Sequence, residues 1–123
     1  MKPSQAPASE LSIQAGFRAR LRYVAPAVSI VAVPNAGKRG SAAVRQAKRE
    51  GLAAGFPDVI ALWSGGSCFI EFKRPGGVLS ENQAEWLERL NRWGHPAKVC
   101  TSVDEALAFL RASGAPFLGG GHG

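Results

Sequence analysis

The sequence predicts a single α/β domain in which one mixed β-sheet is flanked by helices. Its 123 residues are a common length for one domain. Hydrophobic residues make up 46% of the chain and charged residues 20%, which excludes a disordered chain. Helix-like and strand-like patterns alternate in the order α-β-α-β-β-α-β-α, and this alternation indicates a sheet covered by helices.

The first half of the chain predicts two helices separated by a strand. From Ser9, a good N-cap, apolar residues recur at three- and four-residue steps until Pro26 ends the helix. Residues 28–33 (VSIVAV) are β-branched and typical of a strand. The Ala-rich segment 41–50 predicts the second helix, which Gly51 ends.

The second half predicts a hairpin followed by a helix, a strand and a last helix. In order, these elements cover residues 58–63, 68–73, 80–93, 97–101 and 102–113. The folded domain is therefore expected over residues 9–113. Residues 1–8 are expected to be a flexible N-terminus and residues 114–123 a Gly-rich flexible tail.

The hairpin brings together three charged residues. The Gly-Gly pair at 65–66 predicts a two-residue primed turn, which places Asp58 opposite Lys73. Glu71 lies two residues from Lys73 and therefore on the same face. Two carboxylates from adjacent strands suit one Mg²⁺ ion, and a lysine beside them can orient a water or stabilise charge on a phosphate. The alternative is a cross-strand salt bridge, with Asp58 only ending a turn.

The charge of the chain favours a polyanionic partner. Its net charge is +6 and its pI is about 10. The segment 18–49 contains eight basic residues and no acidic one, and arginine suits phosphate because its planar fork can bind two oxygens. Nucleic acid is the partner that this pattern favours, and an ordinary solvated basic surface is the alternative.

Other classes of protein are excluded by composition. Only Cys68 and Cys100 are present, too few for a disulfide scaffold or a cysteine-built zinc site. No stretch approaches the ~18 apolar residues that span a bilayer, and the N-terminus lacks the apolar run of a secretory signal. We therefore expect a cytoplasmic protein, in a bacterial or phage-infected cell, that is not secreted and has no membrane partner.

Five short motifs follow one another along the chain. They are residues 10–14 (ELSIQ), 34–39 (PNAGKR), 55–58 (GFPD), 71–73 (EFK) and 79–86 (LSENQAEW). In this order and spacing they resemble the VRR-NUC (virus-type replication-repair nuclease) family of the PD-(D/E)xK nuclease superfamily, over about residues 9–112. Ala36 stands where that family has a glycine. The resemblance implies the restriction-endonuclease-like core of these nucleases.

The resemblance also implies a role for each residue of the hairpin site. Asp58 and Glu71 would be ligands of Mg²⁺ or Mn²⁺, together with the backbone carbonyl of Phe72. Lys73 would be the catalytic lysine. Glu10 would be a third acid that reaches the metal directly or through a water.

Two of these implied roles have purely structural alternatives. Glu10 lies at the N-terminal edge of the apolar stripe of its helix, yet a first-turn glutamate can simply complement the helix dipole. Gln83 is implied to act beside the site, ordering a water or contacting Lys73. The spacing of Ser80 and Gln83 also forms a complete capping box, so the sequence leaves both interpretations open.

Seven further residues are expected to contact DNA. We expect Asn35, Lys38 and Arg39 near the scissile phosphate, and Arg45, Lys48, Arg49 and Arg74 along the backbone.

The function expected from these features is a Mg²⁺- or Mn²⁺-dependent DNA endonuclease that hydrolyses phosphodiester bonds. A single domain without a separate reading module favours recognition of DNA shape. We expect a homodimer that acts on branched DNA, like a Holliday-junction resolvase, in replication or repair. The alternatives are a flap or single-strand nuclease of a repair complex, and a non-catalytic basic nucleic-acid-binding module.

Overall fold

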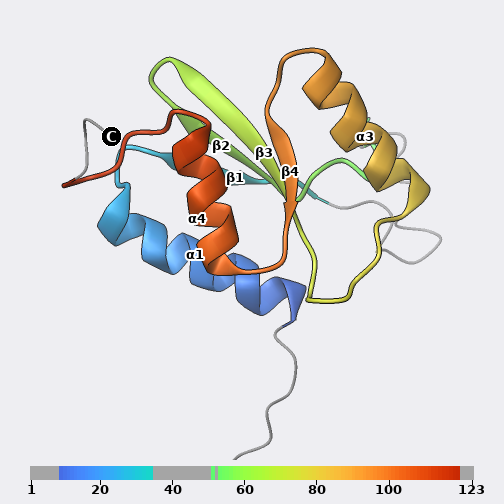
Figure 1. The fold of residues 1–123 in the computed structure, drawn as a ribbon, viewed down its shortest axis with the longest axis horizontal. Helices are drawn as coiled ribbons and strands as arrows, with labels where there is room; N and C mark the ends of the chain where they lie inside the picture. The colour runs from blue at the N-terminus through green and yellow to red at the C-terminus, as the bar shows by residue number, and fades with distance from the viewer. Residues whose placement is uncertain (1–8, 35–50, 52, 120–123) are drawn as a thin grey trace, which may run out of the picture.

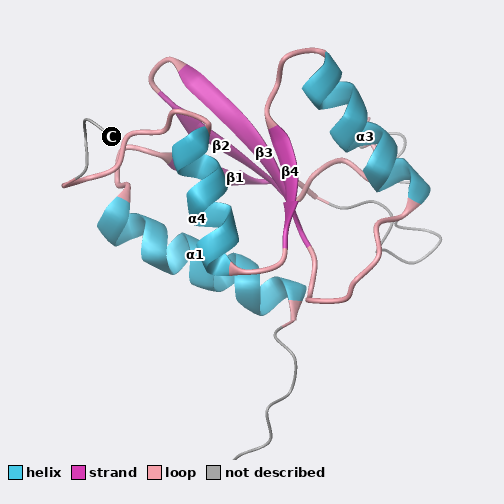
Figure 2. Cartoon of the chain, in the orientation of Figure 1, coloured by secondary structure: helices cyan, strands magenta, loops and turns pink. Residues whose placement is uncertain are grey.

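The chain forms a four-stranded mixed sheet with helices on both faces (Figures 1 and 2). The computed structural model describes residues 9–34, 51 and 53–119. The elements in order are α1 (Glu10–Val24), β1 (Ser29–Ala32), β2 (Val59–Trp63), β3 (Gly66–Phe72), α3 (Glu81–Arg92), β4 (Ala97–Cys100) and α4 (Val103–Ala112). The predicted fold class and these seven elements are confirmed, whereas the helix expected over 41–50 lies outside the described residues.

The sheet has the strand order β1-β2-β3-β4. Strand β2 is antiparallel to both β1 and β3, and β4 is parallel to β3. A parallel neighbour needs a crossover, which α3 supplies. The start of β2 and the end of β3 therefore meet at one end of the sheet.

The hairpin register differs by two residues from the one predicted. The loop is Ser64-Gly65, and Trp63 pairs with Gly66, so Asp58 lies across from Glu71 rather than from Lys73. The turn is not of the primed type, because φ is positive at Gly65 (92°) but at no described non-glycine residue. In this register Gly66 packs against the Trp63 indole, whose Nε1 lies 2.7 Å from where a Cβ on Gly66 would stand. Gly66 is a glycine for close packing across the strands, not for turn formation.

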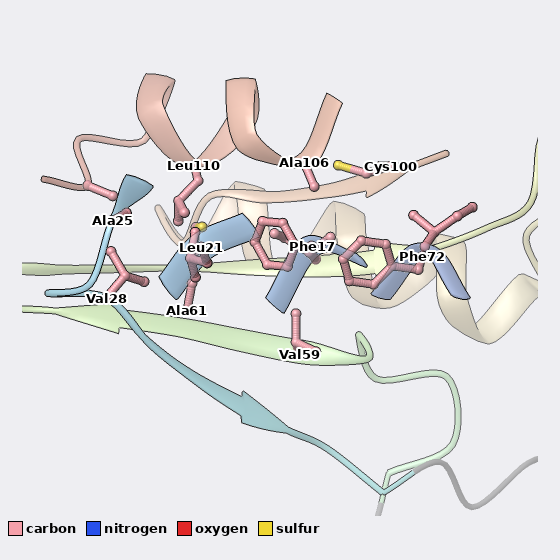
Figure 3. Close-up of a cluster of buried hydrophobic side chains, with 14 of the residues drawn as sticks. Phe17, Leu21, Ala25, Val28, Val59, Ala61, Phe72, Cys100, Ala106 and Leu110 are labelled. Atoms are coloured by element: carbon pink, nitrogen blue, oxygen red, sulfur yellow. The ribbon is translucent and has the colours of Figure 1, made fainter. Parts of the chain in front are cut away.

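The main core lies between the sheet and the pair α1 and α4 (Figure 3). Helix α1 starts at Ser9, whose hydroxyl accepts a hydrogen bond from the Ser12 N–H at 3.0 Å. Its buried side chains are Ile13, Phe17 and Leu21, as the periodicity predicts. Phe17 packs against Phe72 of β3 with ring centroids 5.6 Å apart. This contact fixes α1 against the end of β3.

The two cysteines pack in this core. Both Cys68 and Cys100 are free and buried. Burial raises the pKa of the Cys68 thiol to about 11 and that of the Cys100 thiol to about 12. Both thiols are therefore neutral at physiological pH and act as apolar packing groups.

The C-terminal boundary of the folded part lies beyond the residue 113 that the sequence predicts. Phe117 is buried, and the Arg111 guanidinium lies 4.1 Å from its ring centroid. The Leu118 N–H donates a hydrogen bond to the Val24 carbonyl at 2.8 Å. Burial of this aromatic ring fixes a segment that its glycine content alone would leave loose.

Helix α3 covers the opposite face of the sheet. Leu87 and Leu90 of α3 pack with Ala97 in a second, smaller cluster of buried residues. Phe56 extends this cluster, with its ring centroid 5.8 Å from that of Phe69 and 5.0 Å from that of Trp86. The segment that leads into β2 is thereby fixed against α3.

At Gly55, the segment that leads into β2 comes very close to the backbone of α3. Its φ is +82°, and a Cβ added there would lie 2.6 Å from the Asn82 Cβ and 2.8 Å from the Gln83 backbone nitrogen. Only glycine accommodates both the left-handed conformation and this contact. The first turn of α3 is therefore placed directly on the Gly55 backbone.

We predict that Gly55→Ala destabilises the protein more than the matched change Gly65→Ala. Gly65 also has a positive φ but has open space around it, so its cost is left-handed strain of about 1–2 kcal/mol. Gly55→Ala adds steric overlap worth about 1–3 kcal/mol. Urea denaturation of both variants measures the free energy of unfolding, and equal losses would contradict the close approach of α3.

Candidate active site

Asp58 lies immediately before β2, at the end of the sheet where β3 finishes. Its Oδ2 accepts a hydrogen bond from the Phe72 N–H at 2.8 Å, and its backbone carbonyl accepts one from the Val33 N–H at 2.8 Å. Val59 pairs with Ile70, so two residues further along the antiparallel ladder Phe72 lies across from Pro57, and its N–H points toward that position. The Asp58 carboxylate accepts the hydrogen bond of this amide, so the backbone of β3 fixes the position of the carboxylate.

The Phe72 carbonyl faces the start of β2, as the Phe72 N–H does. In an antiparallel ladder the N–H and C=O of one residue face the same neighbouring strand, so this carbonyl faces the start of β2. Pro57, across from it, has no N–H to donate. The ladder therefore ends with a carbonyl oxygen on the same side of β3 as the Asp58 carboxylate.

Glu71 and Lys73 are charged residues buried at the end of β3. Glu71 is 1% exposed and Lys73 is 8% exposed. The Lys73 Nζ lies 3.8 Å from Glu71 Oε2 and 3.9 Å from Glu10 Oε2. Buried charges are tolerated when they are paired, and this lysine is paired with two carboxylates. The structure thus brings together three residues that the sequence predicts at the site.

Glu10 reaches this group from a different element. It is the first residue of α1, and its side chain is about a quarter exposed. Its place in the first turn also lets it complement the helix dipole, so the structural alternative holds as well. The 3.9 Å approach to the Lys73 Nζ shows that its side chain is directed into the site.

Gln83 forms the capping box that the sequence allowed, and its side chain also reaches Glu71 of the site. The capping box is formed: the Ser80 hydroxyl accepts from the Gln83 N–H at 3.1 Å, and Gln83 Oε1 accepts from the Ser80 N–H at 2.8 Å. The other end of the same amide, Nε2, donates to Glu71 Oε2 at 3.0 Å. Its contact in the site is therefore Glu71, where the resemblance had implied Lys73 or a water.

The donor atoms at this end of the sheet fit a hard divalent cation. No three histidine, cysteine, aspartate or glutamate side chains within residues 9–34, 51 and 53–119 form a group that could hold a metal ion. Mg²⁺ needs fewer protein ligands, since one or two carboxylates suffice and waters and substrate phosphates complete its octahedron. Asp58, Glu71 and the Phe72 carbonyl offer such a set of oxygen donors from adjacent backbone positions.

Six of the seven expected DNA contacts lie outside the part of the chain that the structure describes. They are Asn35, Lys38, Arg39, Arg45, Lys48 and Arg49. Arg74 is exposed and directly follows the buried Lys73, so it lies at the edge of the site.

None of the described helices is long and apolar enough to cross a membrane.

Comparison with known proteins identifies the family. No curated protein matches the sequence. A solved structure described as "VRR_NUC domain protein" has a TM-score of 0.67 and 19% sequence identity, covering 88% of this chain and 89% of that chain, which shows that the two share a fold. The model of the VRR-NUC domain matches residues 10–104, a span that begins at Glu10 and includes Asp58, Glu71, Lys73 and Gln83. The fold is that of a PD-(D/E)xK-like nuclease, and the chain belongs to the VRR-NUC family, a family of nuclease type.

Proposed function

We propose that this protein is a Mg²⁺- or Mn²⁺-dependent deoxyribonuclease that hydrolyses phosphodiester bonds in DNA. The observation that carries the proposal is the buried group at the end of β3, where Lys73 lies within 4 Å of both Glu71 and Glu10. The nuclease-type family supports a nucleic-acid substrate. A non-catalytic binding module accounts for the net charge of +6 but not for a glutamate and a lysine buried together.

Each residue has a distinct task in this proposal. A divalent cation, when bound, supplies Lewis-acid stabilisation of the charge on the phosphate, and Asp58, Glu71 and the Phe72 carbonyl would hold it. The Lys73 ammonium orients the attacking water or stabilises negative charge on a phosphate oxygen. Glu10 and Glu71 hold that ammonium in place, and Gln83 is a positioning residue that orients Glu71.

We predict that Glu71→Gln lowers metal-dependent DNA cleavage by at least about 10²–10³-fold. The amide keeps the size of the side chain but removes the charge that pairs with Lys73. The matched control is Glu88→Gln, which makes the same change at an exposed pair with Arg92 and should leave cleavage unchanged. Cleavage of a labelled duplex in Mg²⁺ and in Mn²⁺ measures both variants. Full activity of Glu71→Gln in both metals, with the fold intact by circular dichroism, would show that the mechanism is wrong.

We predict that Gln83→Leu weakens cleavage by about 10–100-fold and raises the Mg²⁺ concentration needed for half-maximal rate, because Glu71 loses its orienting hydrogen bond. The control is Ser80→Ala, which removes one bond of the cap, costs about 1 kcal/mol of stability and leaves the bond to Glu71. Its Mg²⁺ dependence should match that of the wild type. If Gln83→Leu had the same Mg²⁺ dependence as the wild type, Gln83 would act only as part of the helix cap.

We further propose that the enzyme is a homodimer that selects branched DNA such as four-way junctions. Two-fold assembly would present two active sites to two strands. The edge strand β1 and its neighbour β2 support this, because Val31 and Leu62 lie on one face of the sheet and are 44% and 43% exposed. These apolar side chains are suited to burial against a second copy.

We predict that the wild type cuts a four-way junction by paired incisions and has the mass of a dimer in solution. Val31→Glu should shift the mass toward a monomer and uncouple the two incisions, whereas Tyr23→Glu, at an exposed site on α1, should change neither. A panel of junction, flap, duplex and single strand of matched sequence, with light scattering for mass, measures these outcomes. A monomeric wild type would contradict the dimer, and preferred cutting of the flap or single strand would favour the repair-complex nuclease. Binding of all four without cutting would favour the inert module.

A further inference from the structure

A groove lies between α1 and β1, toward the end of α1 that is opposite to Glu10. Its volume is about 280 Å³. The floor is apolar and two arginines lie at its edge. The lining residues are Arg18, Leu21, Arg22, Ala25, Pro26, Val28 and Ile30.

The two arginines of the groove are available to bind an anion. Arg18 and Arg22 are four residues apart and therefore lie on one side of α1. Within the described part of the chain, neither forms an ion pair. Arg20, by contrast, lies 3.8 Å from Asp104 on α4. Adjacent guanidinium groups without acidic partners form a natural seat for a phosphate, whose oxygens each fork can bind in pairs.

The groove and the candidate active site lie toward opposite ends of α1. Arg18 and Arg22 follow Glu10 by eight and twelve residues, so at 3.6 residues per turn they also lie about 80° and 120° further round the helix. At 1.5 Å per residue, Arg18 lies about 12 Å and Arg22 about 18 Å along the helix from Glu10. A nucleic-acid strand advances about 3.4 Å per nucleotide, so this distance corresponds to about four or five nucleotides.

We propose that this groove binds one unstacked nucleotide of the substrate strand, with its phosphate at Arg18 and Arg22 and its nucleoside against the apolar floor. The volume suits one such group and is too small for a base-paired duplex. Arginines that bound only a solvated phosphate would need no apolar floor beneath them, whereas a nucleobase has apolar faces to bury. The proposal rests on the proposed nuclease function and adds a second contact, a few nucleotides from the bond that is cut.

The test compares Arg18→Ala and Arg22→Ala with the control Arg20→Ala, which removes the same charge from the other flank of α1. Binding of a fluorescein-labelled 12-nucleotide single strand is followed by anisotropy in EDTA, so that no cleavage occurs, over a range of salt concentrations. Each groove variant should bind several-fold more weakly and lower the slope of log affinity against log salt by about 0.7. Arg20→Ala should leave the slope unchanged.

An abasic strand of the same length tests the apolar floor. The wild type should bind it several-fold more weakly than the normal strand, and equal binding would overturn the assignment of the nucleoside. Equal slopes for all three arginine variants would overturn the groove as a nucleic-acid site. Direct binding of polyglutamate that depends on Arg18 and Arg22, with no effect of either substitution on oligonucleotide binding, would assign the groove to an acidic protein instead.

These outcomes are separate from the test of the nuclease itself. Cleavage of the same oligonucleotide by the wild type in Mg²⁺ is measured in parallel. Intact cleavage with equal slopes would overturn only the groove. Absent cleavage with the expected loss of binding in Arg18→Ala and Arg22→Ala would overturn only the nuclease.

Discussion

The pairing of the buried Lys73 with two carboxylates is the interaction on which the rest of the site depends. A charged lysine in a protein interior costs several kcal/mol unless opposite charges and hydrogen bonds offset the loss of water. Here the partners come from the start of α1 and the end of β3, and Gln83 adds the start of α3 through its bond to Glu71. Three elements that are distant in sequence must therefore meet at one end of the sheet.

The GFPD segment before β2 fixes this arrangement through backbone chemistry. Gly55 lets the first turn of α3 approach closely, and Phe56 packs between Phe69 and Trp86. Pro57 removes the amide that would have extended the ladder, and the Asp58 carboxylate accepts the Phe72 N–H at that point. A motif known for its acid thus also sets the position of α3 and the point at which the ladder ends.

The sequence predicts the elements well because their signals are local. The apolar stripe of α1, the caps at Ser9 and Ser80, and the β-branched strand β1 are all formed. The hairpin register was wrong because it depended on which glycine forms the turn: Gly65 lies in the turn, whereas Gly66 pairs with Trp63 and packs against its indole. A shift by two residues preserves the face of each side chain, so Asp58, Glu71 and Lys73 are still on one face of the hairpin. The hydrogen bond from Gln83 to Glu71 could not be predicted from the sequence, because it depends on how α3 packs against β3.

The distribution of charge divides α1 into three sides with different tasks. One side carries Phe17 into the core, and a second carries Arg20 toward Asp104 of α4. The third carries Arg18 and Arg22 at the groove, while Glu10, at the start of the helix, lies within reach of Lys73. The chain as a whole is cationic and attracts nucleic acid, while the site gathers carboxylates that would repel a phosphate without a cation between them. In the proposed function, a helix with an acidic first turn and arginines in its later turns resolves this conflict, since the arginines would hold the strand while the acids would hold the metal.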